Sequence, residues 1–321
     1  MKILAVRTDK LGDFITALPA IYALKKYDKN NHITVLVAPL NEELAKACDF
    51  IDEVVVDDGK SSLFELAKKL KKLNIDASIT LFSNTRVAVA QFLAGIKVRI
   101  APATKIAQIF YNRRIKQRRS EVTMAEFEYN LELTKALFND IDFTYPKPLL
   151  KFDDAKDIYE KFCQENSITK EVIAFHVGFG GSSDANWSLD EYEILIREVL
   201  KQNKYQVVLT FGPDEEHLAK EMQERLRGED VIFYISREGI VSFAKLIANF
   251  RLFVSTSTGT YHLASLVGCP TLTFFADSLF ASAARWKSIG DAKLQNHYML
   301  PSDTSKRVAV FEAVKKELKA I

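Results

Sequence analysis

The strongest constraint on this chain is a regular alternation of short apolar runs with longer amphipathic segments. KILAV at 2–6 precedes FITALPAIYALKKY at 14–27, and ITVLVA, EVVVDD and ASITLF continue the pattern. The same alternation restarts at VIAFHVG, residues 172–178, and continues to PTLTFF at 270–275. Strand and helix signals at this spacing indicate βαβ units and mostly parallel sheets. The chain is therefore predicted to be an α/β protein with two Rossmann-like, doubly wound domains facing a cleft.

The length supports two domains, because 321 residues with 48% hydrophobic content can bury two cores. A proline-bearing stretch, TYPKPLL, interrupts the pattern at 144–150, and we place the linker between about Tyr145 and Lys170. We expect one domain over residues 1–155 and a second over 156–321. The final helix, 307–321, could pack on its own domain or back on the first.

Composition excludes several classes of protein. A formal net charge of +2 provides no general attraction to nucleic acid or acidic membranes. The three cysteines are scattered and lack metal-type spacing, which favours reduced thiols in the cytoplasm. Charged residues from Arg7 to Asp13 interrupt the apolar N-terminus, so we expect no signal peptide. No apolar run approaches the roughly 20 residues of a spanning helix. Membrane contact, if any, is expected at the surface.

The first candidate site is the turn RTDKLGD, which joins the opening strand to an apolar helix. A strand that ends in a glycine-containing turn and leads into a helix is how open α/β sheets build ligand sites at their carboxyl edge. Asp13 is therefore expected to lie at such a crevice. The alternative is that Asp13 caps the helix.

The second candidate site is VSTSTGTYHLASL, where a strand ends in a run of hydroxyls before a glycine and a helix. Backbone N–H groups and the hydroxyls of Thr256, Ser257 and Thr258 could bind an anion such as a diphosphate, and Gly259 would allow close approach. The alternative is a simple helix N-cap. His262 could donate to a phosphate or could be a packing residue.

Two further loops follow predicted strands. HVGFGGSSDANW offers a donor-rich turn at Gly180, Gly181, Ser182 and Ser183. Its downstream end has a structural explanation, since Ser188 and Glu191 have capping-box spacing and Trp187 has the position of a hydrophobic staple. In FGPDEEH, Asp214 could bind ribose hydroxyls, although a helix cap is favoured. GxGxxG and GxxxxGK[ST] are both absent, which disfavours nicotinamide and P-loop enzymes.

The segment from Lys97 to Arg119 is basic and contains no Asp or Glu. It predicts a local anion-binding surface, for which three interpretations remain open: a solvated loop, a nucleic-acid patch, or a site for a phosphorylated acceptor or anionic lipid headgroups. The candidate residues are Lys105, Arg113, Arg114, Lys116, Arg118 and Arg119.

In combination, RTDKLGDFITALPAIYALKK, FGPDEE and VSTSTGTYHLASLVGCPTLTFF, with ARWKSIG downstream, resemble the bacterial heptosyltransferases of lipopolysaccharide core assembly, glycosyltransferase family 9. The resemblance covers nearly the whole chain. It implies a GT-B fold, an ADP-activated heptose donor, a phosphorylated lipid A core acceptor, inversion at the anomeric carbon, and neither a metal nor a cofactor. It also implies a cytoplasmic enzyme, with contact at the inner face of the membrane.

By position, the resemblance implies that Asp13 is the general base and that the second candidate site binds the donor diphosphate. Two positions depart from the family, since Ser257 replaces a usual Asp and Ala185 a usual Lys, and both contact the donor there. These departures weaken the prediction of a heptose donor more than they weaken the prediction of a glycosyltransferase. A nucleotide-sugar-binding protein without catalysis is the alternative. A nucleic-acid-binding protein ranks below both, so no nucleic-acid partner is expected.

Overall fold

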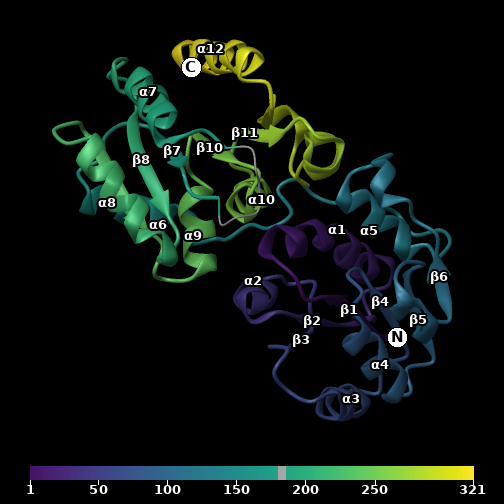
Figure 1. Cartoon of the computed structure of the whole chain (residues 1–321). Coiled ribbons are helices and arrows are strands. Elements are labelled where there is room, and N and C mark those ends of the chain that lie inside the picture. The colour runs from purple at the N-terminus through teal and green to yellow at the C-terminus, as the bar shows by residue number, and fades with distance from the viewer. Residues whose placement is uncertain (180–185) are drawn as a thin grey trace. The chain divides into compact units, whose positions relative to one another are not determined.

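The computed structural model describes residues 1–179 and 186–321 (Figure 1). The chain forms two compact units, Met1–Pro146 and Lys147–Ile321. Each contains a six-stranded sheet in which neighbouring strands pair in parallel, with helices packed around it. Two Rossmann-like domains are thus confirmed.

The first unit has the strand order β3-β2-β1-β4-β5-β6. The order reverses between β1 and β4, and in open α/β sheets such a switch point is where ligands bind. Its elements are β1 (Lys2–Arg7), α1 (Leu11–Tyr27), β2 (His32–Val37), η1 (Pro39–Asn41), α2 (Glu42–Lys46), β3 (Glu53–Val56), α3 (Leu63–Lys72), β4 (Ala77–Thr80), α4 (Thr85–Leu93), β5 (Val98–Pro102), η2 (Ile106–Phe110), β6 (Arg113–Ile115), η3 (Arg119–Glu121) and α5 (Glu126–Thr134).

The second unit repeats this order as β12-β11-β10-β7-β8-β9, so its switch point lies between β7 and β10. Its elements are α6 (Ala155–Glu165), β7 (Val172–His176), α7 (Leu189–Leu200), β8 (Gln206–Phe211), η4 (Pro213–Glu215), α8 (Glu216–Arg225), β9 (Val231–Ile235), α9 (Ile240–Ile247), β10 (Leu252–Thr256), α10 (Gly259–Leu266), β11 (Thr271–Ala276), η5 (Leu279–Ala281), α11 (Ala283–Trp286), η6 (Ala292–Leu294), β12 (Gln295–Leu300) and α12 (Thr304–Ala320).

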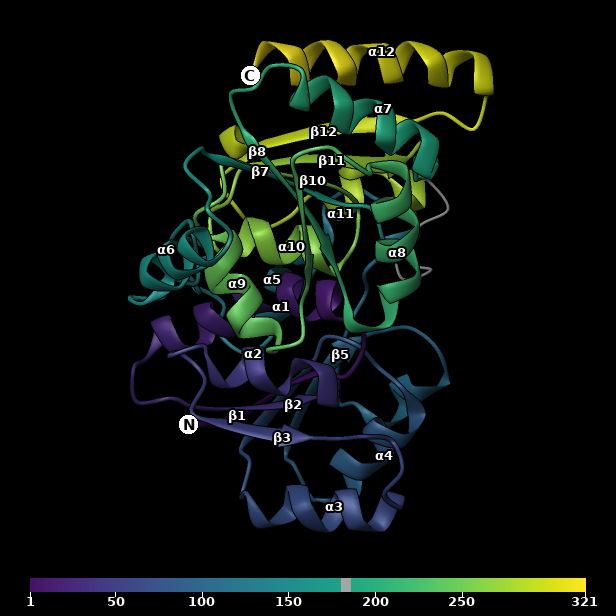
Figure 2. The same cartoon turned by 90° about the vertical axis from the view of Figure 1, so that its left-hand side faces the viewer.

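The apolar runs become strands because helices cover both faces of each sheet. In the first unit, α1 packs on α5, and α3 packs on α4. Figures 1 and 2 show α3 and α4 on the opposite face of the sheet from α1. Leu4 and Val6 of β1 are fully buried in a cluster with Leu66 and Leu70 of α3. Burial on both faces explains why β1 is a continuous apolar run rather than an alternating one.

The boundary between the units lies earlier than the expected division after residue 155. The segment that follows Pro146 already packs on the second unit. The backbone N–H of Leu150 donates to the carbonyl of Leu266 at 3.3 Å. Pro148 lies against Gly268, where an added Cβ would stand 3.1 Å from the proline Cγ. These contacts assign 147–155 to the second unit, although its proline-rich sequence looks like a linker.

The final helix belongs to the second unit, which is one of the two places expected for it. α12 packs on α7 and β12. Val314 and Leu318 are fully buried in the core of that unit. Gln202 donates to the carbonyl of Leu318 at 2.8 Å, and the hydroxyl of Tyr205 donates to that of Ile321 at 2.7 Å. Among the described residues, no helix combines the length and apolarity needed to cross a membrane.

Leu318→Ala tests the contribution of α12 to the second unit. Because Leu318 is fully buried, the change should lower the free energy of unfolding by about 2–4 kcal/mol, through lost burial and a residual cavity. Urea denaturation measures this loss. Leu294→Ala, at a side chain that is 40% exposed, is the control and should change stability far less. Equal losses in the two variants would contradict the packing described for α12.

Candidate functional site

Asp13 lies at the switch point of the first unit, in the first turn of α1. The N-cap of α1 is Lys10, so the alternative that Asp13 caps the helix is wrong. The Asp13 carboxylate instead accepts a hydrogen bond from Nη2 of Arg7 at 2.6 Å. Its side chain keeps 20% of its surface exposed. A carboxylate in the first turn is also favoured by the helix dipole. Asp13 is therefore held at one oxygen and remains accessible to solvent.

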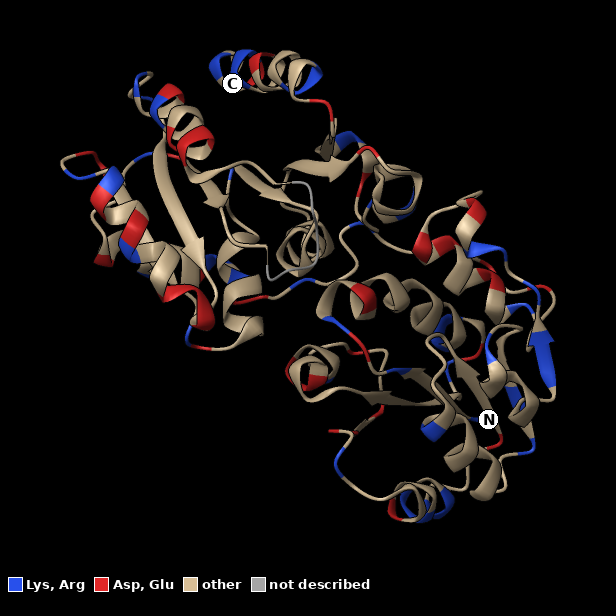
Figure 3. Cartoon of the chain, viewed as in Figure 1, with Lys and Arg blue, Asp and Glu red and all other residues tan. Residues whose placement is uncertain are grey.

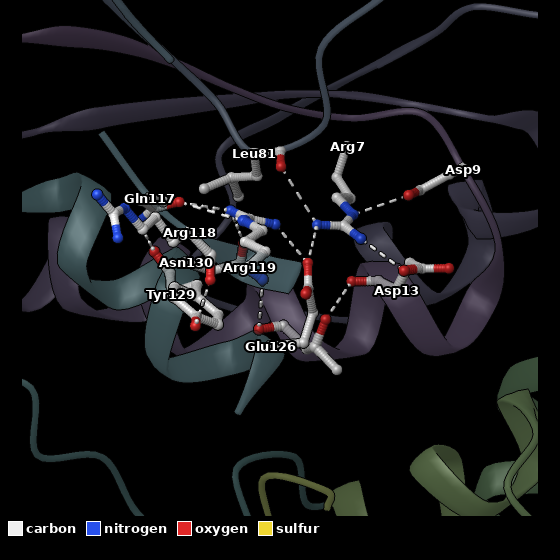
Figure 4. A network of polar contacts seen from close by, with 11 residues as sticks. Arg7, Asp9, Asp13, Leu81, Gln117, Arg118, Arg119, Glu126, Tyr129 and Asn130 are labelled. Carbon is white, nitrogen blue, oxygen red and sulfur yellow. Dashed lines mark hydrogen bonds and ion pairs between the residues drawn. The ribbon is translucent and has the colours of Figure 1, made fainter. Parts of the chain in front are cut away.

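Arg7, the last residue of β1, is the buried centre of this site (Figure 4). Its Nε donates to Asp9 at 2.8 Å, and its Nη1 donates to the Leu81 carbonyl and to Glu126, each at 3.3 Å. Burial alone would lower the pKa of the Arg7 guanidinium, but the neighbouring carboxylates outweigh it and the pKa rises. Arg7 is therefore always charged, and three carboxylates and one carbonyl fix the orientation of its guanidinium group.

Glu126 brings a second cation to the site. It is buried at the start of α5 and forms ion pairs with both Arg7 and Arg119. Arg119 also donates to Gln117 at 3.1 and 3.0 Å, and its guanidinium carbon lies 5.5 Å from the centre of the Tyr129 ring. A buried carboxylate is tolerated when it is paired in this way. No local motif points to Glu126, because 119 residues separate it from Arg7.

Asp9 is a carboxylate of the same cluster, and its pKa is raised. Burial raises its pKa to about 6, with a further upward effect from Asp13, against the lowering effect of Arg7. Burial is the largest cause of this raised pKa, and the neighbouring carboxylate of Asp13 adds to it because like charges disfavour ionisation.

The second candidate site lies at the switch point of the second unit, after β10. Thr256 is buried and its Oγ1 donates to the carbonyl of Phe274 at 3.2 Å. The backbone N–H of Ser257 donates to the same carbonyl at 2.9 Å. Thr258 is the N-cap of α10, but its side chain makes no capping hydrogen bond and instead lies 2.8 Å from the hydroxyl of Thr260. Gly259 opens the helix. The alternative of side-chain capping is therefore wrong, and anion binding stays a prediction.

His262 matches the packing alternative better than the phosphate-binding one. The ring is buried on α10, and its Nδ1 lies 3.2 Å from Oγ of Ser288. Burial lowers the pKa of His262 to about 3, with a further lowering from His297. The side chain is therefore neutral and contributes to the contact between α10 and the segment around Ser288. Its role as a donor to phosphate stays a prediction.

Sequence reasoning missed a pair at the carboxyl ends of β7 and β8. Nε2 of the buried His176 lies 3.7 Å from Oε2 of Glu215, and its Nδ1 lies 3.1 Å from Oγ1 of Thr210. Burial lowers the pKa of His176, against the raising effect of Glu215. Glu215 also accepts from the backbone N–H of Gly212 at 2.7 Å. The capping acid of this turn is thus Glu215 and not Asp214, which is exposed. The position of Glu215, three residues after the N-cap, was the available signal.

The glycine and serine loop of the second unit lies outside the described residues. This covers Gly180, Gly181, Ser182, Ser183 and the departure at Ala185. Just beyond it, the predicted capping box of Ser188 and Glu191 is confirmed, with hydrogen bonds of 2.7 and 3.2 Å. Trp187 is buried against Phe274, which agrees with a structural role.

The basic segment does not form one uniform surface. Arg119 is 18% exposed and belongs to the Arg7 cluster through Glu126. Arg118 pairs with Glu121 at 3.0 Å, just past the acid-free run. The other candidates are exposed: Arg113 and Arg114 on the edge strand β6, which is blue in Figure 3, with Lys105 before η2 and Lys116 after β6. Arg113 donates to the carbonyl of Ala136 at 2.6 Å.

Asp9→Asn tests the raised pKa of Asp9 beside Arg7. Because the folded-state pKa of Asp9 is raised from 3.8 to about 6, the folded protein binds more protons than the unfolded chain between pH 4 and 6. The wild-type free energy of unfolding should therefore fall in that window as the pH rises. The variant lacks this loss, so its stability relative to wild type should increase by about 1–3 kcal/mol from pH 4 to pH 7.

Urea denaturation at several pH values measures this difference. Asp49→Asn, which removes an exposed carboxylate of the same unit, is the control and should show no such trend. A constant difference between Asp9→Asn and wild type across this range would contradict the raised pKa of Asp9 in the folded protein.

Comparison with known proteins identifies the family. Residues 63–308 match the family model for glycosyltransferase family 9 (heptosyltransferase). A Haemophilus influenzae protein, provisionally named a glycosyltransferase, is 38% identical over 300 residues, covering 90% of this chain and 86% of its own. The structure of Escherichia coli ADP-heptose lipopolysaccharide heptosyltransferase II superposes with a TM-score of 0.79 at 18% identity, covering 99% of each chain.

The structure of E. coli heptosyltransferase WaaC with ADP gives a TM-score of 0.77 at 20% identity, covering 100% of this chain and 99% of that one. These solved structures show the same fold. The protein described here therefore belongs to glycosyltransferase family 9 and is a glycosyltransferase of the GT-B fold.

Proposed function

We propose that this protein transfers a heptose or related sugar from an ADP-type donor to a lipopolysaccharide or lipooligosaccharide core, with inversion and without a metal or cofactor. The observation that carries the proposal is the geometry of Asp13. Its carboxylate stands at the carboxyl end of β1, is oriented by a buried cation at 2.6 Å, and keeps part of its surface exposed. A general base needs this combination of fixed direction and access.

In the proposed reaction, Asp13 accepts the proton of an acceptor hydroxyl. The hydroxyl oxygen forms a bond to the anomeric carbon as the bond from that carbon to the diphosphate breaks on the opposite face. The leaving diphosphate takes the electron pair of the broken bond. Backbone N–H groups at the start of α10, with the hydroxyls of Ser257 and Thr258, would stabilise its charge. Gly259 would let the backbone approach the phosphates.

The nucleotide of the donor is proposed from what the relatives bind. The WaaC structure contains ADP, and the heptosyltransferase II structure is named for ADP-heptose. Ser257 and Ala185 replace the acidic and basic residues expected at two donor contacts, so the sugar is assigned less narrowly than the nucleotide. Glu215, which lies beside the carboxyl end of β7, joins its exposed neighbour Asp214 among the candidate donor contacts.

The acceptor side is proposed from a marked segregation of charge. Residues 60–119 contain 14 of the 44 Lys and Arg residues but two of the 42 Asp and Glu residues, which leaves 30 basic and 40 acidic residues elsewhere. Within this segment, Arg114 and Lys116 are exposed, and Lys105 is followed by Ile106 and Ile109, which are 74% and 64% exposed.

Cations beside exposed aliphatic side chains can bind the phosphate groups of a glycolipid while the aliphatic groups contact the membrane surface. Nucleic acid would pair with the cations only, so a glycolipid fits this surface better. We therefore place the acceptor phosphates at the basic segment from Lys97 to Arg119. We place the enzyme in the cytoplasm, in peripheral contact with the inner membrane.

Calorimetric titration with ADP, GDP, UDP and CMP, without metal, tests the donor assignment. ADP should bind most tightly, because the relatives that share this fold bind an adenine nucleotide. Preference for another diphosphate would keep the transferase and change the donor. Binding without transfer to a lipid A core acceptor would favour a nucleotide-sugar-binding protein, for which Ser257 and Ala185 are the motivating departures. Binding of no nucleotide would contradict the proposal.

A further inference from the structure

The polar contacts around Asp13 form a closed ring between α1 and α5 (Figure 4). On one side of the ring, Arg7 donates to Asp13 at 2.6 Å and to Glu126 at 3.3 Å. Glu126 in turn forms its ion pair with Arg119. These contacts lead from the candidate base through a buried cation and a buried acid to a second cation.

On the other side, the ring returns through hydrogen bonds between the two helices. Arg119 donates to the side-chain oxygen of Asn130 at 3.4 Å, and the Asn130 amide donates to the carbonyl of Thr16 at 3.1 Å. The Thr16 hydroxyl donates to the carbonyl of Asp13 at 2.7 Å. The backbone carbonyl and the side-chain carboxylate of Asp13 are thus each connected to Arg119 through a series of hydrogen bonds and ion pairs.

We infer that Glu126 and Arg119 are positioning residues for Asp13, acting through Arg7. The inference rests on the proposed role of Asp13 as the base, but the contacts themselves do not. Arg7 donates to both Glu126 and Asp13, so the negative charge of Glu126 partly offsets the positive charge that Asp13 meets. Arg119 balances Glu126 in turn. Glu126 and Arg119 therefore both influence the orientation of the Asp13 carboxylate and the electrostatic potential around it.

The two residues have opposite charges, which gives the inference a signed test. Glu126→Gln removes a negative charge near the Asp9 and Asp13 carboxylates, so protons should leave them more readily. The acidic limb of the pH dependence of kcat should move to lower pH. Arg119→Gln removes a positive charge and should move that limb to higher pH. Either variant should lower kcat by about tenfold through misplacement of the base, with the KM for donor nearly unchanged.

Matched controls come from the same region. Glu132→Gln changes the charge of a partly exposed residue of α5 that pairs with Lys135. Lys135→Gln removes the cation of the same pair, whose side chain is 48% exposed. Both should keep the wild-type pH dependence and kcat. A purely structural role for Glu126 and Arg119 would lower activity in both test variants without shifts of opposite sign.

A second readout needs no substrate. The side-chain carboxyl carbon of Asp9, followed by ¹³C NMR, should titrate below its midpoint of about 6 in Glu126→Gln and above it in Arg119→Gln. Opposite shifts in the two variants, absent in the controls, would support the network even if no transfer were detected, in which case the proposed function alone fails. Unchanged Asp9 titration in both folded variants would overturn the inference. If Glu126→Gln does not fold, Arg119→Gln decides by itself.

Discussion

The site depends on one buried cation. Arg7 ends β1 inside the first unit, and a guanidinium there is stable because carboxylates from three places in the sequence surround it. The same arrangement keeps Asp9, Asp13 and Glu126 together, since without the cation three acids would repel one another in a poorly solvated place. Arg7 is thus both a structural requirement of the β1–α1 junction and the group that gives Asp13 its orientation.

The fold places this cation where chemistry can use it. Each sheet reverses its strand order once, between β1 and β4 in the first unit and between β7 and β10 in the second. One candidate site follows β1, and the other follows β10. In the first unit this position holds a carboxylate held by a cation. In the second it holds a hydroxyl-rich turn and a helix start. One is suited to accepting a proton and the other to stabilising an anion, which are the two requirements of a metal-independent displacement.

Much of the architecture followed from periodicity, because strands buried on both faces have an unmistakable apolar pattern. Asp13 and the turn before Gly259 were found from their positions after such strands. Contacts between distant segments were not predictable: nothing near Glu126 indicates that it meets Arg7, and nothing near His176 indicates Glu215. The role of one local acid was misjudged for a related reason. Asp214 looks like a helix cap in sequence, but Gly212 occupies the N-cap position and Glu215 is the capping acid.

The central claim is that Asp13 removes the proton from the acceptor, and Asp13→Asn tests it most directly. The substitution keeps the size of the side chain and an oxygen that can accept from Arg7. Transfer from ADP-heptose to a lipid A core acceptor, with donor affinity measured in parallel, should show kcat lowered by roughly 100-fold or more and donor binding retained. Asp28→Asn, at the exposed end of α1, should transfer at the wild-type rate. Wild-type turnover in Asp13→Asn would remove Asp13 from the mechanism.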